Sequence, residues 1–586
     1  MKTKAIHLTL TALLLSPLAG LDAAERDSLS HGLGALMKDA TLELTAEKRY
    51  LNIPMAYQGV ERHVTFLIDG KPESAFSTFG MVLADGKPDW WASRDISAFT
   101  GKKITLMVDK LPADSAALKS VEQTDQMKDM ANLYNEKQRP QFHFSTMRGT
   151  SGDVNGLVFY QGEYHLFFQH NPYGRVSSQS THWGHAVSRN LVHWQELPSA
   201  LYPDDNGKEW SGSGVVDWAN TSGFQTGQEK PFVLIYASAG KKLTQCIAFS
   251  NDKGRTWTKY DKNPALPFVG NANRDPRVFW YAPEKKWVMA LAFGHDSRQN
   301  GGKPTTNPNY GLFSSKDLKS WEQMSTLFMD NTCDCPEFFE IAVDGDKKNT
   351  RWIFYSGDAI YLVGKFDGKT FAAESGPHQL NQGNAFYASQ TFSDIPQEDG
   401  RRILMAAGGP GGSDRTRFRG AIGLPVEVTL RTTDDGLRLF AYPVKELESL
   451  RVKSHVLTPQ PLKPGVNPLA DVHGELFDVV ADIALGAASE IAFNLRGVPV
   501  TYDVKKQELV CNGRRAMLKP MDGSIRLRLF VDRTSIDIFG NDGRVYMPMG
   551  ATFPKNHDRL ELTVKDGAAK VQALEVHELK SIWKVQ

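Results

Sequence analysis

A phrase that recurs through the middle of the sequence constrains the fold more than any other feature. Each copy combines a short apolar strand, a polar turn with Asp or Asn, and an aromatic residue. The copies are AVSRNLVHW ending at Trp194, AFSNDKGRTW ending at Trp257, LFSSKDLKSW ending at Trp321 and a weaker VGKFDGKTF ending at Phe371. Their spacing of roughly 50 to 65 residues is the length of one four-stranded propeller blade. We therefore predict a five-bladed β-propeller over residues 142–425; the alternative is a β-sandwich in which similar hairpins recur by chance.

The segments on both sides of the predicted propeller alternate apolar and polar residues at period two. Residues 25–111 contain HVTFLIDG and KITLMVDKL, which predict an N-terminal β-sandwich accessory domain. Residues 455–586 contain EIAFNLRG and IRLRLFVDRTSIDIFGNDGRVYMP, whose Asp-Gly turns predict a C-terminal β-sandwich. A polar linker over 112–141 and a junction over 426–454 separate these units from the propeller. The whole chain is therefore predicted to be all-β.

Charge and hydropathy exclude two classes of partner. The 586 residues contain 68 Lys and Arg against 67 Asp and Glu, and no dense basic block appears, so we expect no nucleic acid partner. No stretch beyond the N-terminus approaches the roughly 18 to 20 apolar residues of a membrane span. A near-neutral protein of this kind suits a neutral substrate such as a sugar. The oligomeric state stays open.

The N-terminus has the pattern of a secretory signal peptide. Lys2 and Lys4 precede an apolar stretch from Ala5 to Leu18, and small residues follow as far as Ala24. We therefore predict a signal peptide over residues 1–24 and a secreted or periplasmic protein; the alternative is a buried N-terminal helix. The four cysteines are too few to staple so long a chain, and the sequence offers no metal site around them.

Three acidic motifs lie in different predicted blades. They are GDVNGL with Asp153, NRDPRVFWY with Asp275 and CDCPEFFEI with Asp334. A propeller gathers the inner strands of its blades around one axis, so carboxylates far apart in sequence can converge in one pocket. Converging carboxylates in a neutral protein favour glycoside hydrolysis, which needs one carboxylate at the anomeric carbon and one acid at the leaving oxygen. Taken singly, each Asp is also common at turns.

These motifs resemble those of glycoside hydrolase family 32, the invertases, inulinases and levanases. The first motif and FFQHNP are similar to the family's first signature, and RDP, the position of its Glu-Cys-Pro, WSGSG, FYASQTF and LRLFVDRTSIDIF follow in the family's order. The resemblance covers residue 142 to the C-terminus. It implies a secreted hydrolase that cleaves β-fructofuranosidic bonds in fructans of levan or inulin type, or in sucrose, by a retaining double displacement and without a cofactor.

The resemblance also implies roles for individual residues. Asp153 corresponds to the nucleophile, Asp275 to the carboxylate that stabilises the transition state, and Asp334 to the acid/base. In a retaining enzyme, nucleophile and acid lie about 5 to 5.5 Å apart. The residues at the family's sugar-contacting positions are Asn155, Gln169, Trp210, Ser211 and Arg274.

The sequence departs from the family pattern at several of these positions. Asp334 stands where the family has Glu, and a catalytic group misplaced by about 1 Å can cost on the order of 100-fold in rate. Other departures are Gly152 for Asn, Val154 for Pro, Ala385 for Asp, and Ser177 and Ser178 near a position where many members carry a pocket tryptophan. They leave open a catalytically weakened carbohydrate-binding relative, an enzyme acting on another furanoside, or a fructosyltransferase.

Overall fold

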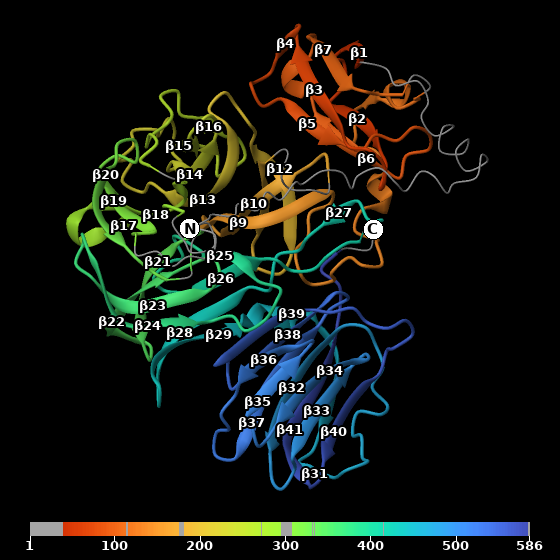
Figure 1. The fold of residues 1–586 in the computed structure, drawn as a ribbon, viewed down its shortest axis with the longest axis vertical. Helices are drawn as coiled ribbons and strands as arrows, with labels where there is room; N and C mark the ends of the chain where they lie inside the picture. The colour runs from red at the N-terminus through yellow and green to blue at the C-terminus, as the bar shows by residue number, and fades with distance from the viewer. Residues whose placement is uncertain are drawn as a thin grey trace, which may run out of the picture.

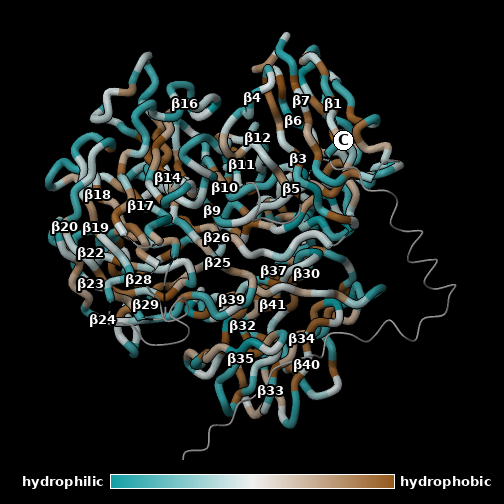
Figure 2. Tube along the Cα trace, turned by 45° about the horizontal axis from the view of Figure 1, so that its top comes forward, coloured by the Kyte–Doolittle hydropathy of each residue, from teal (hydrophilic) through white to brown (hydrophobic). Residues whose placement is uncertain are grey.

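The protein consists of three all-β units, seen in a computed structural model that describes residues 39–112, 115–174, 181–270, 272–294, 307–330, 332, 334–413 and 415–583 (Figure 1). The predicted signal peptide, Ser177, Ser178 and Cys333 lie outside the described residues. Hydrophobic segments follow the strands inside each unit (Figure 2). Helix in the described part of the chain is limited to the 3-10 turns η1 (Ser97–Phe99), η2 (Leu118–Ser120), η3 (Met130–Asn132), η4 (Ala282–Glu284) and η5 (Lys445–Leu450). Among these residues, none forms an apolar helix of membrane-spanning length.

The N-terminal unit is a sandwich of two antiparallel sheets. The first sheet has the order β1 (Asp39–Thr45), β7 (Lys103–Asp109), β3 (Arg62–Ile68) and β4 (Lys71–Pro72), with β5 (Thr78–Met81) also paired to β3. The second has the order β6 (Trp90–Asp95), β2 (Tyr50–Met55) and β8 (Glu122–Thr124). Their facing side chains form one apolar core around Phe66, Trp90 and Leu106.

The central unit is the predicted five-bladed propeller. Blade 1 contains β9 (Gly149–Tyr160), β10 (Glu163–Asn171), β11 (His182–Ser188) and β12 (Trp194–Leu201), and blade 2 contains β13 (Lys208–Val216), β14 (Phe232–Ala239), β15 (Leu243–Ser250) and β16 (Thr258–Lys259). Blade 3 contains β17 (Arg274–Tyr281), β18 (Lys286–Ala292), β19 (Tyr310–Ser315) and β20 (Glu322–Leu327), and blade 4 contains β21 (Glu337–Val343), β22 (Asp346–Tyr355), β23 (Ile360–Phe366) and β24 (Phe371–Gln379). Blade 5 contains β25 (Tyr387–Thr391), β26 (Arg402–Ala407), β28 (Val426–Thr433) and β29 (Gly436–Pro443). The short strand β27 (Phe418–Arg419) pairs in parallel with β9.

The repeated phrase spans the outer half of a blade. In each strong copy the tryptophan indole N–H donates to a carbonyl three residues earlier: Trp194 to Leu191 at 3.0 Å, Trp257 to Gly254 at 3.1 Å and Trp321 to Leu318 at 3.0 Å. The tryptophan therefore closes the turn between the third and outermost strands, and its partly buried ring packs against its own or a neighbouring blade.

The C-terminal unit is a second sandwich. One sheet has the order β30 (Arg451–Leu457), β41 (Ala569–Leu579), β32 (Phe477–Ala484), β37 (Ser524–Val531), β38 (Ser535–Gly540) and β39 (Val545–Gly550), with β31 (Gln460–Leu462) also paired to β41. The other has the order β36 (Arg514–Met517), β35 (Glu508–Cys511), β34 (Val498–Asp503), β33 (Glu490–Leu495) and β40 (Leu560–Lys565). Phe530, Phe539 and Tyr546 of the first sheet belong to the same apolar cluster as the propeller core, so the two units are packed together.

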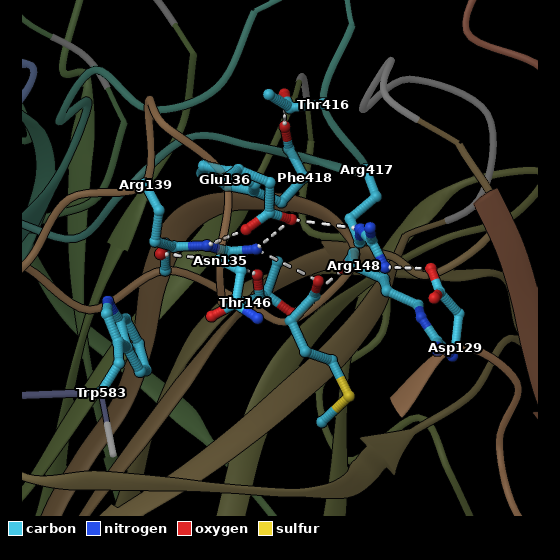
Figure 3. A network of polar contacts seen from close by, with 12 residues as sticks. Asp129, Asn135, Glu136, Arg139, Thr146, Arg148, Thr416, Arg417, Phe418 and Trp583 are labelled. Atoms are coloured by element: carbon cyan, nitrogen blue, oxygen red, sulfur yellow. Dashed lines mark hydrogen bonds and ion pairs between the residues drawn. The ribbon is translucent and has the colours of Figure 1, made fainter. Parts of the chain in front are cut away.

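The polar segment expected to be a linker is divided between two units: its β8 belongs to the N-terminal sandwich, and residues 136–140 pack closely against the propeller. Arg139 is fully buried; its guanidinium donates to Thr146 O at 2.7 Å, pairs with Glu136 at 2.9 Å and lies over the Phe418 ring (Figure 3). The indole N–H of Trp583 donates to Pro140 O at 2.6 Å. These contacts attach residues 136–140 to the propeller and to the far end of the chain.

Candidate active site

A cavity of about 370 Å³ opens where the inner strands of the blades begin. These strands approach one another around the propeller axis, with β13 in contact with β9 and β17, and β25 in contact with β9 and β21. Seven of the eight predicted site residues line the cavity, and they are Asp153, Gln169, Trp210, Ser211, Arg274, Asp275 and Asp334. Three carboxylates therefore meet at one place, although 122 residues separate Asp153 from Asp275 and 59 separate Asp275 from Asp334.

Asn155 is the predicted residue that does not line the cavity. It lies two residues after Asp153 on β9, which places it one pleat deeper along the propeller axis. Its side chain is fully buried, and its Oδ1 accepts a hydrogen bond from Gly212 N at 3.2 Å. Asn155 therefore fixes the backbone beside Ser211 from behind the cavity.

Asp153 is half-buried and has one close side-chain partner. The Ser211 hydroxyl donates to Asp153 Oδ2 at 2.8 Å. Burial raises the pKa of Asp153, the charge of Asp334 adds to that rise, and the hydrogen bond from Ser211 opposes it. A Cβ atom on Gly152 would lie 3.2 Å from the Cβ of Gln169, so the side chain that the family carries at this position would crowd Gln169.

Asp275 lies at the start of β17 with a left-handed backbone, φ 57°. The backbone amide of Cys335 donates to its Oδ2 at 3.0 Å, and Arg274 Nε lies 3.7 Å from the same oxygen. Burial raises the pKa of Asp275, and the neighbouring Asp334 carboxylate raises it further. One carboxylate oxygen is thus fixed by the protein.

Asp334 comes three residues before β21, and both of its carboxylate oxygens have partners. Arg274 pairs with Oδ1, and the Tyr387 hydroxyl donates to Oδ2 at 3.0 Å. Asp334 and Cys335 both have positive φ, 69° and 39°. Such backbone is costly outside glycine and is found where surrounding structure imposes it, often at functional sites.

Two nearby acids lie outside this cavity. Glu337 is fully buried; its carboxylate lies 2.6 Å from Arg277 Nε and accepts the amide of Thr391 at 2.7 Å. Glu340 is exposed and accepts a hydrogen bond from Thr350. Neither carboxylate lies where it could replace Asp334.

The sequence prediction missed Tyr387 and Cys335, which also line the cavity. Tyr387 is the second residue of the FYASQTF motif, directly after Phe386, so the sequence did contain a signal for it. The part played by Cys335 is a backbone N–H, which no side-chain pattern encodes.

The N-terminal sandwich contacts the chain beside the cavity. Tyr173, just after the QHNP motif, is buried in the core of that sandwich, with its ring centroid 5.0 Å from Phe79 and 6.0 Å from Phe66. His182, next to the cavity-lining Thr181, lies 5.7 Å from Phe79. The accessory unit therefore packs against two residues that lie close in sequence to the cavity-lining Gln169 and Thr181.

Comparison with known proteins identifies the family. Residues 143–443 match the family model described as Glycosyl hydrolases family 32 N-terminal domain, and residues 446–578 match Glycosyl hydrolases family 32 C terminal. The chain is 38% identical over 501 residues to a levanase of Bacillus subtilis, covering 77% of this chain and 72% of that protein. It is 29% identical over 532 residues to an extracellular exo-inulinase of Aspergillus ficuum, covering 77% and 96%.

The fold comparison agrees. The crystal structure of exo-inulinase from Aspergillus awamori superposes with a TM-score of 0.69 at 25% identity, over 77% of this chain and all of that one. The matched family models, the propeller with its C-terminal sandwich, and the relatives together show that this chain is a glycosidase and belongs to glycosyl hydrolase family 32.

Proposed function

We propose that the protein is a secreted β-fructosidase that hydrolyses β-fructofuranosidic bonds in fructans or sucrose with retention of configuration. The observation that carries the proposal is the convergence of Asp153, Asp275 and Asp334 in one cavity of a chain related to a levanase. The relatives named as levanase and exo-inulinase support a fructan substrate. Two observations support export: the Aspergillus ficuum relative is named an extracellular exo-inulinase, and residues 1–24 have the pattern of a signal peptide.

In the first step, a carboxylate oxygen of Asp153 attacks the anomeric carbon of the fructosyl unit. The bond from that carbon to the glycosidic oxygen breaks, and protonated Asp334 gives its proton to the departing oxygen. In the second step, Asp334 takes a proton from water, whose oxygen attacks the same carbon and releases Asp153. Asp275, one oxygen of which is fixed by the Cys335 amide, accepts hydrogen bonds from fructose hydroxyls with its other oxygen.

The remaining cavity residues position the sugar. Gln169 lies 3.4 Å from the Ser211 hydroxyl and donates to Glu209 O at 3.2 Å, which orients its amide along β13. Trp210 is 38% exposed at the cavity and presents an aromatic face to a sugar ring. Arg274 contacts Asp334 and lies near Asp275, so it fixes the spacing of these two carboxylates.

The test is sugar release by the purified protein from levan, inulin and sucrose, beside Asp153→Asn as an isosteric control. The proposal expects fructose or short fructans from the wild type and none from the variant. Reaction in the presence of methanol then reports stereochemistry, because retention yields the methyl β-fructofuranoside. No release from any of the three substrates by folded wild type, or equal release by Asp153→Asn, would refute the proposal.

Asp334 gives a specific reason to keep a second candidate, a carbohydrate-binding relative with weak turnover. Its side chain is one methylene shorter than the family's Glu, and both oxygens are engaged by Arg274 and Tyr387. In that case Asp153→Asn would bind fructans as the wild type does, and the wild type would release almost no sugar. Measuring binding and release on the same samples separates the two candidates.

A further inference from the structure

A second and larger cavity lies at the opposite ends of the inner strands. Its volume is about 550 Å³, within the usual range for small-ligand sites. It is lined by the last residues of β13 and β17, by the first half of β21, and by Ser393 and Asp394 just after β25. It shares no lining residue with the catalytic cavity. The buried pair of Arg277 and Glu337, which bridges β17 and β21, lies between the two.

The mouth of this cavity carries two exposed tryptophans. Trp218 is 52% exposed and Trp280 is 37% exposed. All twelve tryptophans of the chain are among the described residues, and the third exposed one is Trp210 at the catalytic cavity. Every exposed indole therefore lies at one of the two cavities, which is unexpected if exposure were incidental to packing.

Both indoles are fixed in orientation. The Trp218 indole N–H donates to Asp394 Oδ1 at 2.8 Å, and the other oxygen of Asp394 accepts Val216 N at 3.1 Å. The ring of Trp280 packs against Trp287 at 5.0 Å with an angle of 66°. Rigid aromatic faces with one exposed side suit a ligand that presents C–H groups, because little conformational entropy is lost on contact.

Behind the aromatic mouth lie buried polar atoms without partners. Ser393 is 91% buried, given its 9% exposure, and its Oγ has no hydrogen-bond partner; Nη1 of buried Arg277 has none either. Both residues line the cavity. Since buried polar groups are normally satisfied, such atoms indicate a hydrogen-bonding ligand or bound water at this place.

The charges around the cavity favour a neutral ligand. Asp217 is committed to the hydroxyls and amides of Thr221 and Ser222. The other charged residues of the lining are also engaged or of mixed sign: both oxygens of Asp394 accept hydrogen bonds, Arg277 is paired with Glu337, and Glu340 and Arg402 carry opposite charges. A site built for an anion or a cation would present several unpaired charges of one sign.

We propose that this cavity is a second carbohydrate-binding site, which takes a neutral sugar chain through stacking on Trp218 and Trp280 and hydrogen bonding to the polar groups behind them. The identity of the chain as a fructan rests on the proposed function. Such a site holds the polymer on the enzyme while the catalytic cavity acts at another point of the same polymer. It raises the local concentration of substrate ends without taking part in bond cleavage.

The experiment measures retention of the full chain in native gels that contain levan or inulin. Both cavities bind in the wild type, so the test uses Asp153→Asn as background and adds Trp218→Ala with Trp280→Ala. We expect affinity for the polymer to fall about tenfold, whereas the same tryptophan changes in the active enzyme leave the rate on sucrose within about twofold. Met517→Ala, which removes an exposed side chain on the C-terminal sandwich, is the matched control and changes neither readout.

Unchanged retention in the folded double variant would overturn the proposal, as would a wild type that degrades levan and inulin without any retention. Trp218→Ala also removes the hydrogen bond to Asp394 and could disturb folding for that reason. In that case Trp280→Ala alone tests the proposal, because the Trp280 indole does not bond to Asp394, and retention should still fall. Failure of the proposed function is distinguishable. A protein that releases no sugar but loses polymer retention on the tryptophan changes still carries the binding site.

Discussion

Ser211→Ala tests whether the cavity controls the ionisation of Asp153. The Ser211 hydroxyl is buried and donates to Asp153 Oδ2 at 2.8 Å. Burial and the charge of Asp334 raise the pKa of Asp153, and this hydrogen bond opposes both. Because the bond favours the charged form, its removal raises the pKa of Asp153 further and lowers the ionised fraction at acid pH.

The magnitude follows from the hydrogen bond. A bond to a charged group contributes about 1.5–3 kcal/mol, which is a factor of about 10 to 150 at 1.4 kcal/mol per tenfold. On the acid limb, where activity follows the ionised fraction of Asp153, kcat/KM should fall by that factor. Above the limb the carboxylate is ionised in both proteins, so the loss should shrink as pH rises.

The assay is kcat/KM on sucrose across the acid limb and the plateau for the wild type, Ser211→Ala and Ser213→Ala. Ser213 is the matched control, because it is a fully buried serine on the same strand whose hydroxyl donates to Pro276 O at 2.8 Å and not to a carboxylate. The control should leave the position of the acid limb unchanged. An equal loss at every pH in Ser211→Ala would refute the reasoning and would assign Ser211 to sugar contact alone.

Four further changes have expected outcomes. Tyr387→Phe removes the donor 3.0 Å from Asp334 Oδ2 and should lower kcat about tenfold on sucrose, at a cost of about 1.4 kcal/mol. Asp334→Glu should lower kcat by on the order of 100-fold, because Arg274 and the Tyr387 hydroxyl already engage both oxygens and the longer side chain displaces them by about 1 Å. Tyr173→Ala empties a buried site at the N-terminal sandwich and should destabilise the protein by about 3 kcal/mol, measured by denaturant unfolding. Burial lowers the pKa of His143, but the adjacent carboxylates of Asp532 and Asp537 outweigh this and raise the pKa to about 10. The stability that His143 contributes is therefore complete below about pH 6.5, its ordinary pKa, and is lost as pH rises through about 10. His143→Gln should flatten the dependence of unfolding free energy on pH over that range.

Each of these outcomes has a clear opposite. Wild-type kcat in Tyr387→Phe would show that the hydroxyl does not act on Asp334. Higher activity in Asp334→Glu would mean that the native Asp is an impaired acid. An unchanged free energy of unfolding in Tyr173→Ala would show that the packing of Tyr173 in the N-terminal sandwich does not stabilise the protein. The same pH profile of stability in His143→Gln and the wild type would show that this imidazole stays neutral.

The propeller was predictable because its signal is local. The tryptophan of each strong repeat bonds to a carbonyl three residues earlier, so one short segment encodes the turn and the outer strands of a blade. The three carboxylates were predictable for a related reason, since each belongs to a short motif at or just before an inner strand. Topology alone then brings them together.

Other parts of the cavity depend on contacts between blades and could not be predicted in this way. Tyr387 reaches Asp334 from blade 5, and the Cys335 amide reaches Asp275 only because the backbone at Asp334 and Cys335 turns through positive φ. Asn155 has the expected residue type and spacing, but it lies one pleat deeper, outside the cavity lining, where its Oδ1 accepts the Gly212 amide. In each case the role depends on how deep the residue lies along the propeller axis or on where its side chain or backbone amide points. A sequence motif does not encode either property.

The buried pair of Arg277 and Glu337 explains how the inner strands of blades 2 to 5 can serve two cavities. An unpaired carboxylate on the propeller axis would add a like charge beneath the catalytic acids and raise their pKa values further. Pairing at 2.6 Å neutralises that charge, and the amide of Thr391 satisfies the second oxygen of Glu337. Removing one partner of such a pair leaves an uncompensated buried charge, which costs about 3–5 kcal/mol of stability. The two side chains therefore stay paired in the folded protein. Along the inner strands, the catalytic carboxylates therefore lie at one end, the neutral Arg277–Glu337 pair in the middle, and Trp218 and Trp280 at the other end. Because the pair separates the two cavities, a sugar bound at the tryptophans leaves the charges of the catalytic cavity unchanged.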